Sequence, residues 1–411
     1  MKETADQKLW KRRWLEKKEA QLLPNVGIYV GTGSSHSWMW FVDLFESYGL
    51  TRLHFYDEKD FIGTTLDEID ALIISGGDTF GVAEALGPGS SDIIKEFVAQ
   101  GGLYIGSCAG AYLPMHSSKE HLNHFNFVNV KITNLTKTLP QAMQMAHKCY
   151  ISYGCQYIYH PVREEVKILI NGDDPLFSGQ VISAPLYGGP GMSLGDGVTA
   201  LAHYQSFTDK TLYLIDKEIA ERTLLGKVAV ARADMDKGRF YLFGPHFEHP
   251  HYTEANIYLI NTIYKEMQTR TVHRASLQAE EQARLTGEQA KIFKRTLRRE
   301  LSNARIVAYS LETAPVYWKI GFKIYSPPQI AVFIEAMWRR IRNLERMEVI
   351  KTTSGNPDTL LEYAGELAGL LRELKARLTS NEDSESTARK IFPLLSAYAK
   401  LFFSIYFQSL A

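Results

Sequence analysis

The sequence predicts an α/β protein: a flavodoxin-like, open, mostly parallel sheet with helices on both faces, followed by an all-α helical domain. From residue 24 to about 267, short apolar runs alternate with helix-period segments, as expected for strands covered on both faces. After residue 267 glycine becomes sparse and helix-period patterns dominate. We therefore expect a charged helical extension over 1–23, the α/β domain over 24–267 and a bundle-like helical domain over 268–411.

The first half of the α/β region supplies four strands and two helices. The strands are short apolar runs, and each helix ends at a glycine, a common residue at a helix C-terminus. In chain order the elements are strand 26–30, helix 38–48, strand 52–56, strand 71–75, helix 92–100 and strand 103–106. Sites of such sheets lie at the carboxyl ends of the strands, so we expect chemistry just after the last two strands.

The second half of the α/β region is rich in turns before two further strands. Residues 128–211 contain several Gly- and Pro-rich turns, which predict β-hairpins and long loops around the site. Strands follow at 228–232 and 238–243. The helical domain is expected to hold four helices, at 274–308, 328–350, 357–378 and 386–410.

Composition narrows the class of protein. Of 411 residues 45% are hydrophobic and 22% charged, with 46 basic and 46 acidic side chains, so no net charge points to nucleic acid. Three cysteines cannot build a disulfide framework and fit a reducing compartment. The most apolar segment, 391–410, is interrupted by Lys400 and fits a packed helix better than a membrane span. We expect a cytoplasmic protein that contacts neither nucleic acid nor membrane.

The segment 102–112 carries the strongest functional signal. Its apolar strand runs into Gly106-Ser107-Cys108-Ala109-Gly110, which matches the Gly-x-nucleophile-x-Gly pattern of a nucleophile elbow with cysteine as nucleophile. A Cβ at either flanking glycine would crowd the strand or the following helix. The dipole of that helix would favour a reactive thiolate. The segment therefore predicts a cysteine nucleophile at Cys108.

A cysteine nucleophile needs a base and a group that orients the base. His246 and Glu248 follow the strand at 238–243 as an i, i+2 pair, and in an extended segment both side chains would point to one face. Taken alone, His246-Phe247-Glu248 could equally be an exposed polar loop. Downstream of a cysteine elbow, the order Cys…His-x-Glu favours a catalytic triad.

These motifs together resemble the class I glutamine amidotransferase-like superfamily, and within it the biotin-protein ligase N-terminal domain family. The resemblance covers about 24–264 and depends on Gly76-Gly77-Asp78, on the segment from Ile94 to Tyr112 and on Tyr187-Gly188-Gly189-Pro190. It implies that Cys108 is the nucleophile, His246 the base and Glu248 the orienting group.

The resemblance also implies an oxyanion hole and a substrate pocket. The backbone N–H groups of Gly77 and Ala109 are the candidate oxyanion donors, and Gly76, Asp78 and Tyr112 belong to the predicted pocket. Glutamine amidotransferases usually carry a Gln four residues after the cysteine, where this chain has Tyr112. No adenylate-binding loop of a biotin ligase is present.

The sequence therefore favours a cysteine-dependent amidohydrolase-like protein that acts on a small amide or peptide-like substrate, and not a biotin ligase. A non-catalytic binding or regulatory module and a cysteine peptidase on the same fold remain alternatives. No cofactor is expected, and the histidines near Glu248 match no zinc pattern. The C-terminal helices could serve a homo-oligomer or a protein partner.

Overall fold

The computed structural model describes residues 23–61, 66–149, 156–171, 176–269, 283–320, 323–352 and 356–410. The helical extension expected over 1–23 falls, except for its last residue, outside the described residues. Contacts divide the chain into two compact units: unit 1 holds residues 1–50 and 56–275, and unit 2 holds residues 51–55 and 276–411. Each unit is described by itself.

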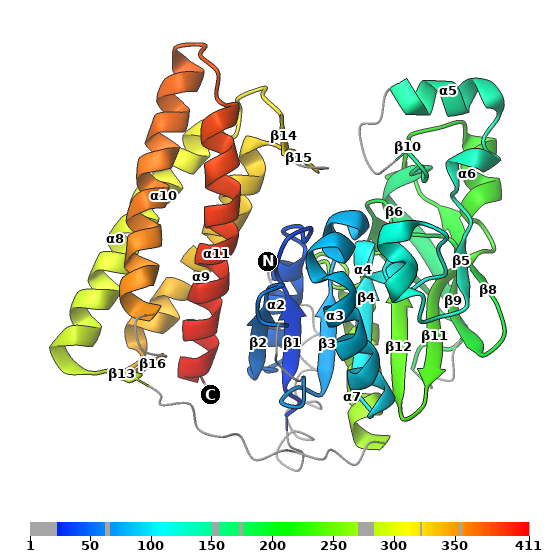
Figure 1. The fold of residues 1–411 in the computed structure, drawn as a ribbon, viewed down its shortest axis with the longest axis horizontal. Coiled ribbons are helices and arrows are strands. Elements are labelled where there is room, and N and C mark those ends of the chain that lie inside the picture. Colours follow the sequence, from blue (N-terminus) through cyan, green and yellow to red (C-terminus); the bar gives the residue numbers. More distant parts are fainter. Residues whose placement is uncertain are drawn as a thin grey trace. The chain divides into compact units, whose positions relative to one another are not determined.

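Four parallel strands form the half of the unit 1 sheet that carries the site (Figure 1). They lie in the order β1-β3-β4-β12, and their bounds are Val26–Tyr29, Ala71–Ile74, Leu103–Ser107 and Gly238–Phe243. β4 pairs in parallel with β3 on one side and with β12 on the other. The chain segments that follow β3, β4 and β12 therefore meet at one edge of the sheet, as the sequence predicts.

Beyond β12 the same sheet continues with antiparallel strands. The order is β12-β11-β9-β6-β10, with β7 paired to β6, and with β8 paired to both β11 and β5. The bounds are β5 Val130–Ile132, β6 Val162–Ile170, β7 Val181–Leu186, β8 Met192–Leu194, β9 Val198–Phe207, β10 Leu212–Tyr213 and β11 Val228–Met235. The turn-rich region thus forms the predicted hairpins, and these extend the parallel sheet.

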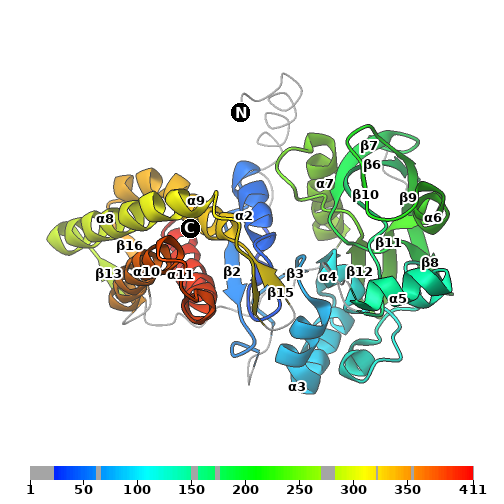
Figure 2. The same ribbon diagram turned by 90° about the horizontal axis from the view of Figure 1, so that it is seen from above.

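Helices cover both faces of the parallel strands, which confirms the predicted fold class (Figure 2). α3 (Thr79–Ala99) lies on one face, and α2 (Trp38–Ser47) and α7 (Thr253–Thr269) lie on the other. Buried side chains of α3, including Leu86 and Ile94, form one apolar core with side chains of the central strands. The shorter helices are α4 Ala109–Tyr112, α5 Gln141–Cys149, α6 Lys217–Leu224 and the 3₁₀ turns η1 Glu120–Phe125 and η2 Thr136–Thr138.

The helix predicted at 92–100 begins thirteen residues earlier, at Thr79. The sequence Gly87-Pro88-Gly89 indicates a break, and the structure has one there as a kink, with Gly87 at φ 65°. Proline is tolerated in the first turn of a helix, so Pro88 can follow the left-handed glycine and open a second helical segment. The stretch before the kink, from Thr79 to Leu86, was not predicted to be helical.

Unit 2 is a bundle of four long helices, as predicted. α8 contacts α9 and α10, and α11 contacts the same two helices, so the four close into a ring. Their bounds are α8 Gly287–Leu311, α9 Pro327–Arg346, α10 Asn356–Thr379 and α11 Glu385–Leu410. β2 (Leu53–Tyr56) contributes Phe55 to this unit, where its ring contacts Phe403 and Phe407.

Two short antiparallel strand pairs accompany the four helices of unit 2, a detail that the sequence did not predict. β13 (Ala283–Leu285) pairs with β16 (Ile350–Thr352), and β14 (Trp318–Ile320) pairs with β15 (Lys323–Tyr325). Residues 283–285 and 350 were expected to be helical. The backbone turns extended at Met347, which ends α9 and lets the fully buried Ile350 pair with Leu285.

Among the described residues, α11 is the one helix that is long and apolar enough to cross a membrane by length and composition. Its most apolar stretch has a mean hydropathy of 1.2, and 56% of that stretch is buried inside the structure. Burial of this extent is also what a core helix of a bundle shows.

We expect Gly110→Ala to destabilise unit 1, because a Cβ at position 110 would lie 1.8 Å from the carbonyl oxygen of Ile74. Forcing a backbone shift of this kind costs at least about 1–3 kcal/mol. Gly89→Ala is the matched control, since a Cβ there meets nothing within 4 Å. Thermal unfolding of both variants tests this, and equal melting temperatures would refute the close packing.

Candidate active site

Cys108 occupies a strained turn between β4 and α4. Its backbone has φ 52° and ψ −106°, a conformation that a non-glycine residue rarely adopts and that is often found at active sites. The N–H of Cys108 donates to the carbonyl of Phe243 at 2.9 Å, and the N–H of Gly110 donates to the carbonyl of Ser75 at 3.1 Å. The elbow is therefore fastened to the ends of both neighbouring strands.

The two glycines of the elbow are required by close backbone approaches. A Cβ on Gly106 would lie 2.1 Å from the carbonyl oxygen of Gly110, and a Cβ on Gly110 would collide with Ile74. Both contacts confirm the crowding predicted from the sequence.

The helix after the cysteine is much shorter than expected. α4 has four residues, Ala109 to Tyr112, so it provides one turn and only a small dipole. The dipole of this short helix therefore contributes little at Cys108. What the turn does provide is the N–H of Ala109, which donates no hydrogen bond among the described residues.

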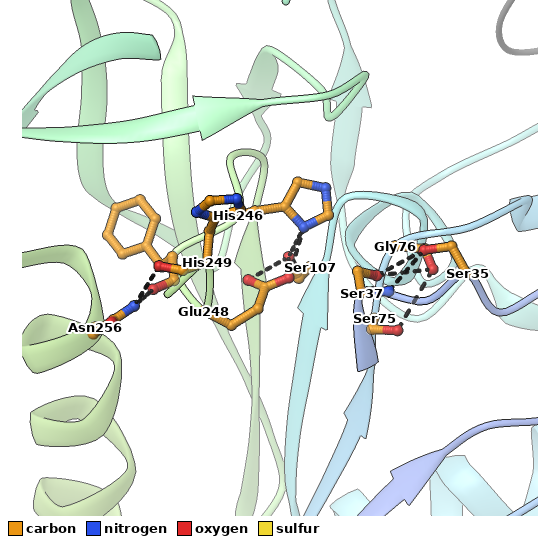
Figure 3. A network of polar contacts seen from close by, with 10 residues as sticks. Ser35, Ser37, Ser75, Gly76, Ser107, His246, Glu248, His249 and Asn256 are labelled. Atoms are coloured by element: carbon orange, nitrogen blue, oxygen red, sulfur yellow. Dashed lines mark hydrogen bonds and ion pairs between the residues drawn. The ribbon is translucent and has the colours of Figure 1, made fainter. Parts of the chain in front are cut away.

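His246 and Glu248 lie together, by a different geometry from the one predicted. His246 Nδ1 is 2.6 Å from Glu248 Oε1, and the two residues are 3% and 1% exposed (Figure 3). Residues 247 and 248 are in a turn, not an extended segment, and the N–H of His249 donates to the carbonyl of His246. The turn, not a two-residue strand period, brings the carboxylate to the imidazole.

A side chain from α7 holds this turn in place. The Asn256 amide donates to the carbonyl of Phe247 at 2.6 Å and to that of His249 at 3.1 Å (Figure 3). On the other side, the N–H of His246 donates to the carbonyl of Pro185 at the end of β7. The turn is therefore fixed from both the helix layer and the sheet.

The surroundings of His246 favour its protonated form. Burial opposes the charge, but the Glu248 carboxylate and the hydrogen bonds with Cys108 and Glu248 outweigh it and raise the pKa of His246 from 6.5 to about 10. The imidazole thus lies between the thiol of Cys108 and the carboxylate of Glu248. The structure brings together all three residues of the predicted triad.

Half-buried rings flank the imidazole. The ring centroids of Trp40 and Tyr187 lie 5.4 and 5.6 Å from that of His246, and Trp40 also contacts His249 at 4.6 Å. Burial, followed by the charges of His251 and His246, lowers the pKa of His249 to about 4. Near pH 7 His249 is therefore uncharged while His246 is charged. His249 cannot substitute for His246 as the proton carrier.

The other predicted site residues take several roles. Gly76 abuts the imidazole, since a Cβ there would lie 2.6 Å from Cε1 of His246. Gly77 is exposed, and its N–H, like that of Ala109, has no acceptor among the described residues. Asp78 caps α3 by accepting from the N–H groups of Phe80 and Gly81.

Tyr112, where amidotransferases usually have glutamine, is bonded within the protein. Its hydroxyl donates to the carbonyl of Gly188 at 3.1 Å and accepts from the side-chain amide of Asn134 at 2.9 Å. Only 8% of Tyr112 is exposed. These bonds join the turn after Cys108 to the loop that begins at Tyr187.

Ser107 is a site residue that the sequence did not reveal. It ends β4, is fully buried, and its hydroxyl lies 3.0 Å from both carboxylate oxygens of Glu248 (Figure 3). A hydroxyl at the end of an otherwise apolar strand, next to the nucleophile, was the available signal. Serine is compatible with many positions, so that signal alone did not assign a role.

A cavity in unit 1 lies away from the triad. It has a volume of about 420 Å³ and is lined by Glu165, Ser183, Lys210, His251, Tyr252, Thr253 and Glu254. Within the described ranges, no group of three His, Cys, Asp or Glu side chains could hold a metal ion.

The comparisons with known proteins agree with the resemblance found in the sequence. Residues 66–124 match the family model described as "Biotin-protein ligase, N terminal", which covers β3, α3 and the elbow. The resemblance to this family is confirmed over that segment, which is less than half of the chain. No curated protein matches the chain in sequence.

Three solved structures illustrate the structural likeness. A glutamine amidotransferase from Thermotoga maritima is 9% identical, with 60% of this chain and 87% of that chain covered and a TM-score of 0.34. A putative ThuA-like protein from Bacteroides uniformis is 13% identical, with 61% of this chain and 95% of that chain covered and a TM-score of 0.35. A β-galactosidase from Bacillus circulans sp. alkalophilus is 13% identical, with 63% of this chain and 34% of that chain covered and a TM-score of 0.33. The chain therefore spans about a third of that enzyme's length. Likeness at this level bears on no detail of the site.

The raised pKa of His246 predicts a pH dependence of stability. Between 6.5 and about 10 the folded state holds a proton that the unfolded state releases, so stability falls as pH rises through this window. The slope should exceed that of His246→Gln by up to about 1.4 kcal/mol per pH unit. Urea unfolding at several pH values measures it. His249→Gln is the control and should keep the wild-type slope, and equal slopes for all three proteins would contradict the charged imidazole.

Proposed function

We propose that this protein is a cysteine-dependent amidohydrolase-like enzyme that acts on a small amide or peptide-like substrate. The observation that carries the proposal is the bond of 2.6 Å between His246 Nδ1 and Glu248 Oε1 beside Cys108. An acid oriented and charge-paired in this way can hold the proton of a thiol and later deliver it. The confirmed resemblance over 66–124 supports the same reaction family.

The reaction would proceed through an acyl-thioester. The Cys108 thiolate attacks the amide carbonyl carbon, and the carbonyl electron pair moves to oxygen. As the tetrahedral intermediate collapses, the C–N bond breaks and the imidazolium of His246 protonates the leaving amine. The neutral imidazole then takes a proton from water, and the resulting hydroxide attacks the carbonyl carbon of the thioester. As this second intermediate collapses, the C–S bond breaks and the acid departs, which leaves Cys108 as a thiolate beside the imidazolium, as at the start. Glu248 keeps the imidazole oriented throughout and remains a carboxylate.

The N–H groups of Gly77 and Ala109 are the proposed oxyanion donors. Preorganised donors of this kind stabilise charge that develops in the transition state, and they must be free of other acceptors. The neighbouring N–H groups of Cys108, Asp78 and Gly110 are already bonded to carbonyls. Among the N–H groups of this region, those of Gly77 and Ala109 therefore remain as the candidate donors.

The substrate proposed here is not glutamine, and the activity is not biotin ligation. Tyr112 stands where amidotransferases usually place glutamine, and its hydroxyl is occupied by Gly188 and Asn134. The part of the chain after residue 283 forms a helical bundle with two short strand pairs, which does not resemble a ligase core. A peptidase would use the same residues, so the nature of the amide separates the two enzyme classes.

A second candidate is a non-catalytic binding or regulatory module. It is favoured by the burial of the thiol, since Cys108 is 8% exposed. In this case the domain would bind a ligand or partner without turnover, with the helical unit as a docking surface. A probe that reaches Cys108 from solvent separates the candidates.

Alkylation of Cys108 across pH tests the activated nucleophile. We expect iodoacetamide to label Cys108 in the wild type near pH 7 at least about ten-fold faster than in His246→Ala, because the imidazolium stabilises the thiolate. His249→Ala is the matched control and should label at the wild-type rate. Equal rates in the wild type and His246→Ala would reject the proposal.

A screen of small amides and peptides for an acyl adduct tests turnover. Intact-mass spectrometry should detect the added mass of the acyl group on the wild type. It should detect no such addition on Cys108→Ser. Labelling of Cys108 by iodoacetamide, with no adduct from any amide, would instead favour the binding module.

A further inference from the structure

The carboxylate of Glu248 is almost completely buried and has two hydrogen-bond donors among the described residues. One is His246 Nδ1, 2.6 Å from Oε1, and the other is the hydroxyl of Ser107. Ser107 Oγ lies 3.0 Å from Oε1 and also 3.0 Å from Oε2. Its distance to His246 Nδ1 is 3.5 Å, which is too long to compete with the shorter contact.

A serine hydroxyl has one proton to donate, and donating it to the carboxylate oxygen that has no other donor satisfies the most acceptors. Oε1 already receives the proton of His246 Nδ1, so Ser107 satisfies Oε2. Because a buried carboxylate oxygen without a partner is costly, this bond compensates the burial of Oε2. Ser107 and His246 therefore both donate hydrogen bonds to the carboxylate of Glu248.

We propose that Ser107 is a positioning residue of the triad, which acts through Glu248 to limit how tightly the carboxylate holds the imidazolium of His246. This inference rests on the proposed function for its catalytic meaning, since the imidazolium must release its proton to the leaving amine. The geometry of Ser107, Glu248 and His246 does not depend on the proposed function. A serine immediately before the nucleophile thus adds a fourth member to Cys108, His246 and Glu248.

The direction of the effect follows from the two charge states of the pair. When His246 is neutral, the full charge of Glu248 remains, and the Ser107 bond stabilises it strongly. When His246 is protonated, the carboxylate is already compensated, and the same bond contributes less. Removing the hydroxyl therefore penalises the neutral imidazole more, and His246 should hold its proton more tightly.

Other titratable groups face the pair of His246 and Glu248 from the elements packed against it. Cys108 comes from the elbow, Tyr187 from the loop after β7, and His249 from the turn itself. Tyr204 is a further titratable group near Cys108. Burial raises its pKa, and the charges of Tyr112 and Cys108 raise it further. None of these side chains is changed by a substitution at Ser107, so its effect can be read on His246 directly.

Nitrogen NMR of the His246 ring across pH tests the inference without any substrate. We expect Ser107→Ala to raise the pKa of His246 above its wild-type value by about one unit, a ten-fold tighter hold on the proton. Ser107→Thr keeps the hydroxyl and should titrate like the wild type. A pKa that is unchanged or lowered in Ser107→Ala overturns the inference, and so does an equal rise in Ser107→Thr.

A near-isosteric variant covers the case in which Ser107→Ala does not fold. Ser107→Cys keeps the side-chain volume but replaces a good donor with a weak one, so it should raise the same pKa by a smaller amount. No rise in a folded Ser107→Cys overturns the inference. Because the titration needs no turnover, a shifted pKa without an acyl adduct would leave Ser107 in its role and reject only the proposed reaction.

Discussion

The contact between His246 and Glu248 is the interaction on which the rest of the site depends. Both side chains are almost fully buried, so neither can rely on water to stabilise its charge. Their hydrogen bond of 2.6 Å compensates that burial, and the hydroxyl of Ser107 satisfies the remaining carboxylate oxygen. The fold must therefore deliver three side chains from two strand ends to one point in its interior.

The parallel half of the sheet meets this requirement by its order. β4 lies between β3 and β12, so the glycines after β3, the elbow after β4 and the turn after β12 converge at one edge. Backbone contacts then hold the elbow, because Cys108 donates to β12 and Gly110 donates to the residue just after β3. The missing side chains at Gly76, Gly106 and Gly110 leave room for these approaches. A strained cysteine can persist there because the surrounding contacts fix it.

Much of this arrangement could be predicted from the sequence, because its signals are local. Apolar runs predicted the parallel strands, and the two glycines predicted the elbow around Cys108. The pairing of His246 with Glu248 was predicted from a strand period, although a turn held by Asn256 produces it. Ser107 and Trp40 could not be assigned, because their roles depend on contacts with Glu248 and His246, which are far away in the sequence. Asn256 could not be assigned because it bonds to a turn that was predicted to be extended. β13 and β16 were missed because they pair across more than sixty residues.

The protonation state of His246 in the wild type and in Glu248→Gln tests the account most directly. Nitrogen NMR at about pH 8, well above the ordinary pKa of histidine, distinguishes an imidazolium from a neutral ring. We expect both ring nitrogens to be protonated in the wild type and the ring to be neutral in Glu248→Gln, where the carboxylate no longer opposes the effect of burial. A neutral His246 in the wild type, or an imidazolium that survives the loss of Glu248, would contradict it.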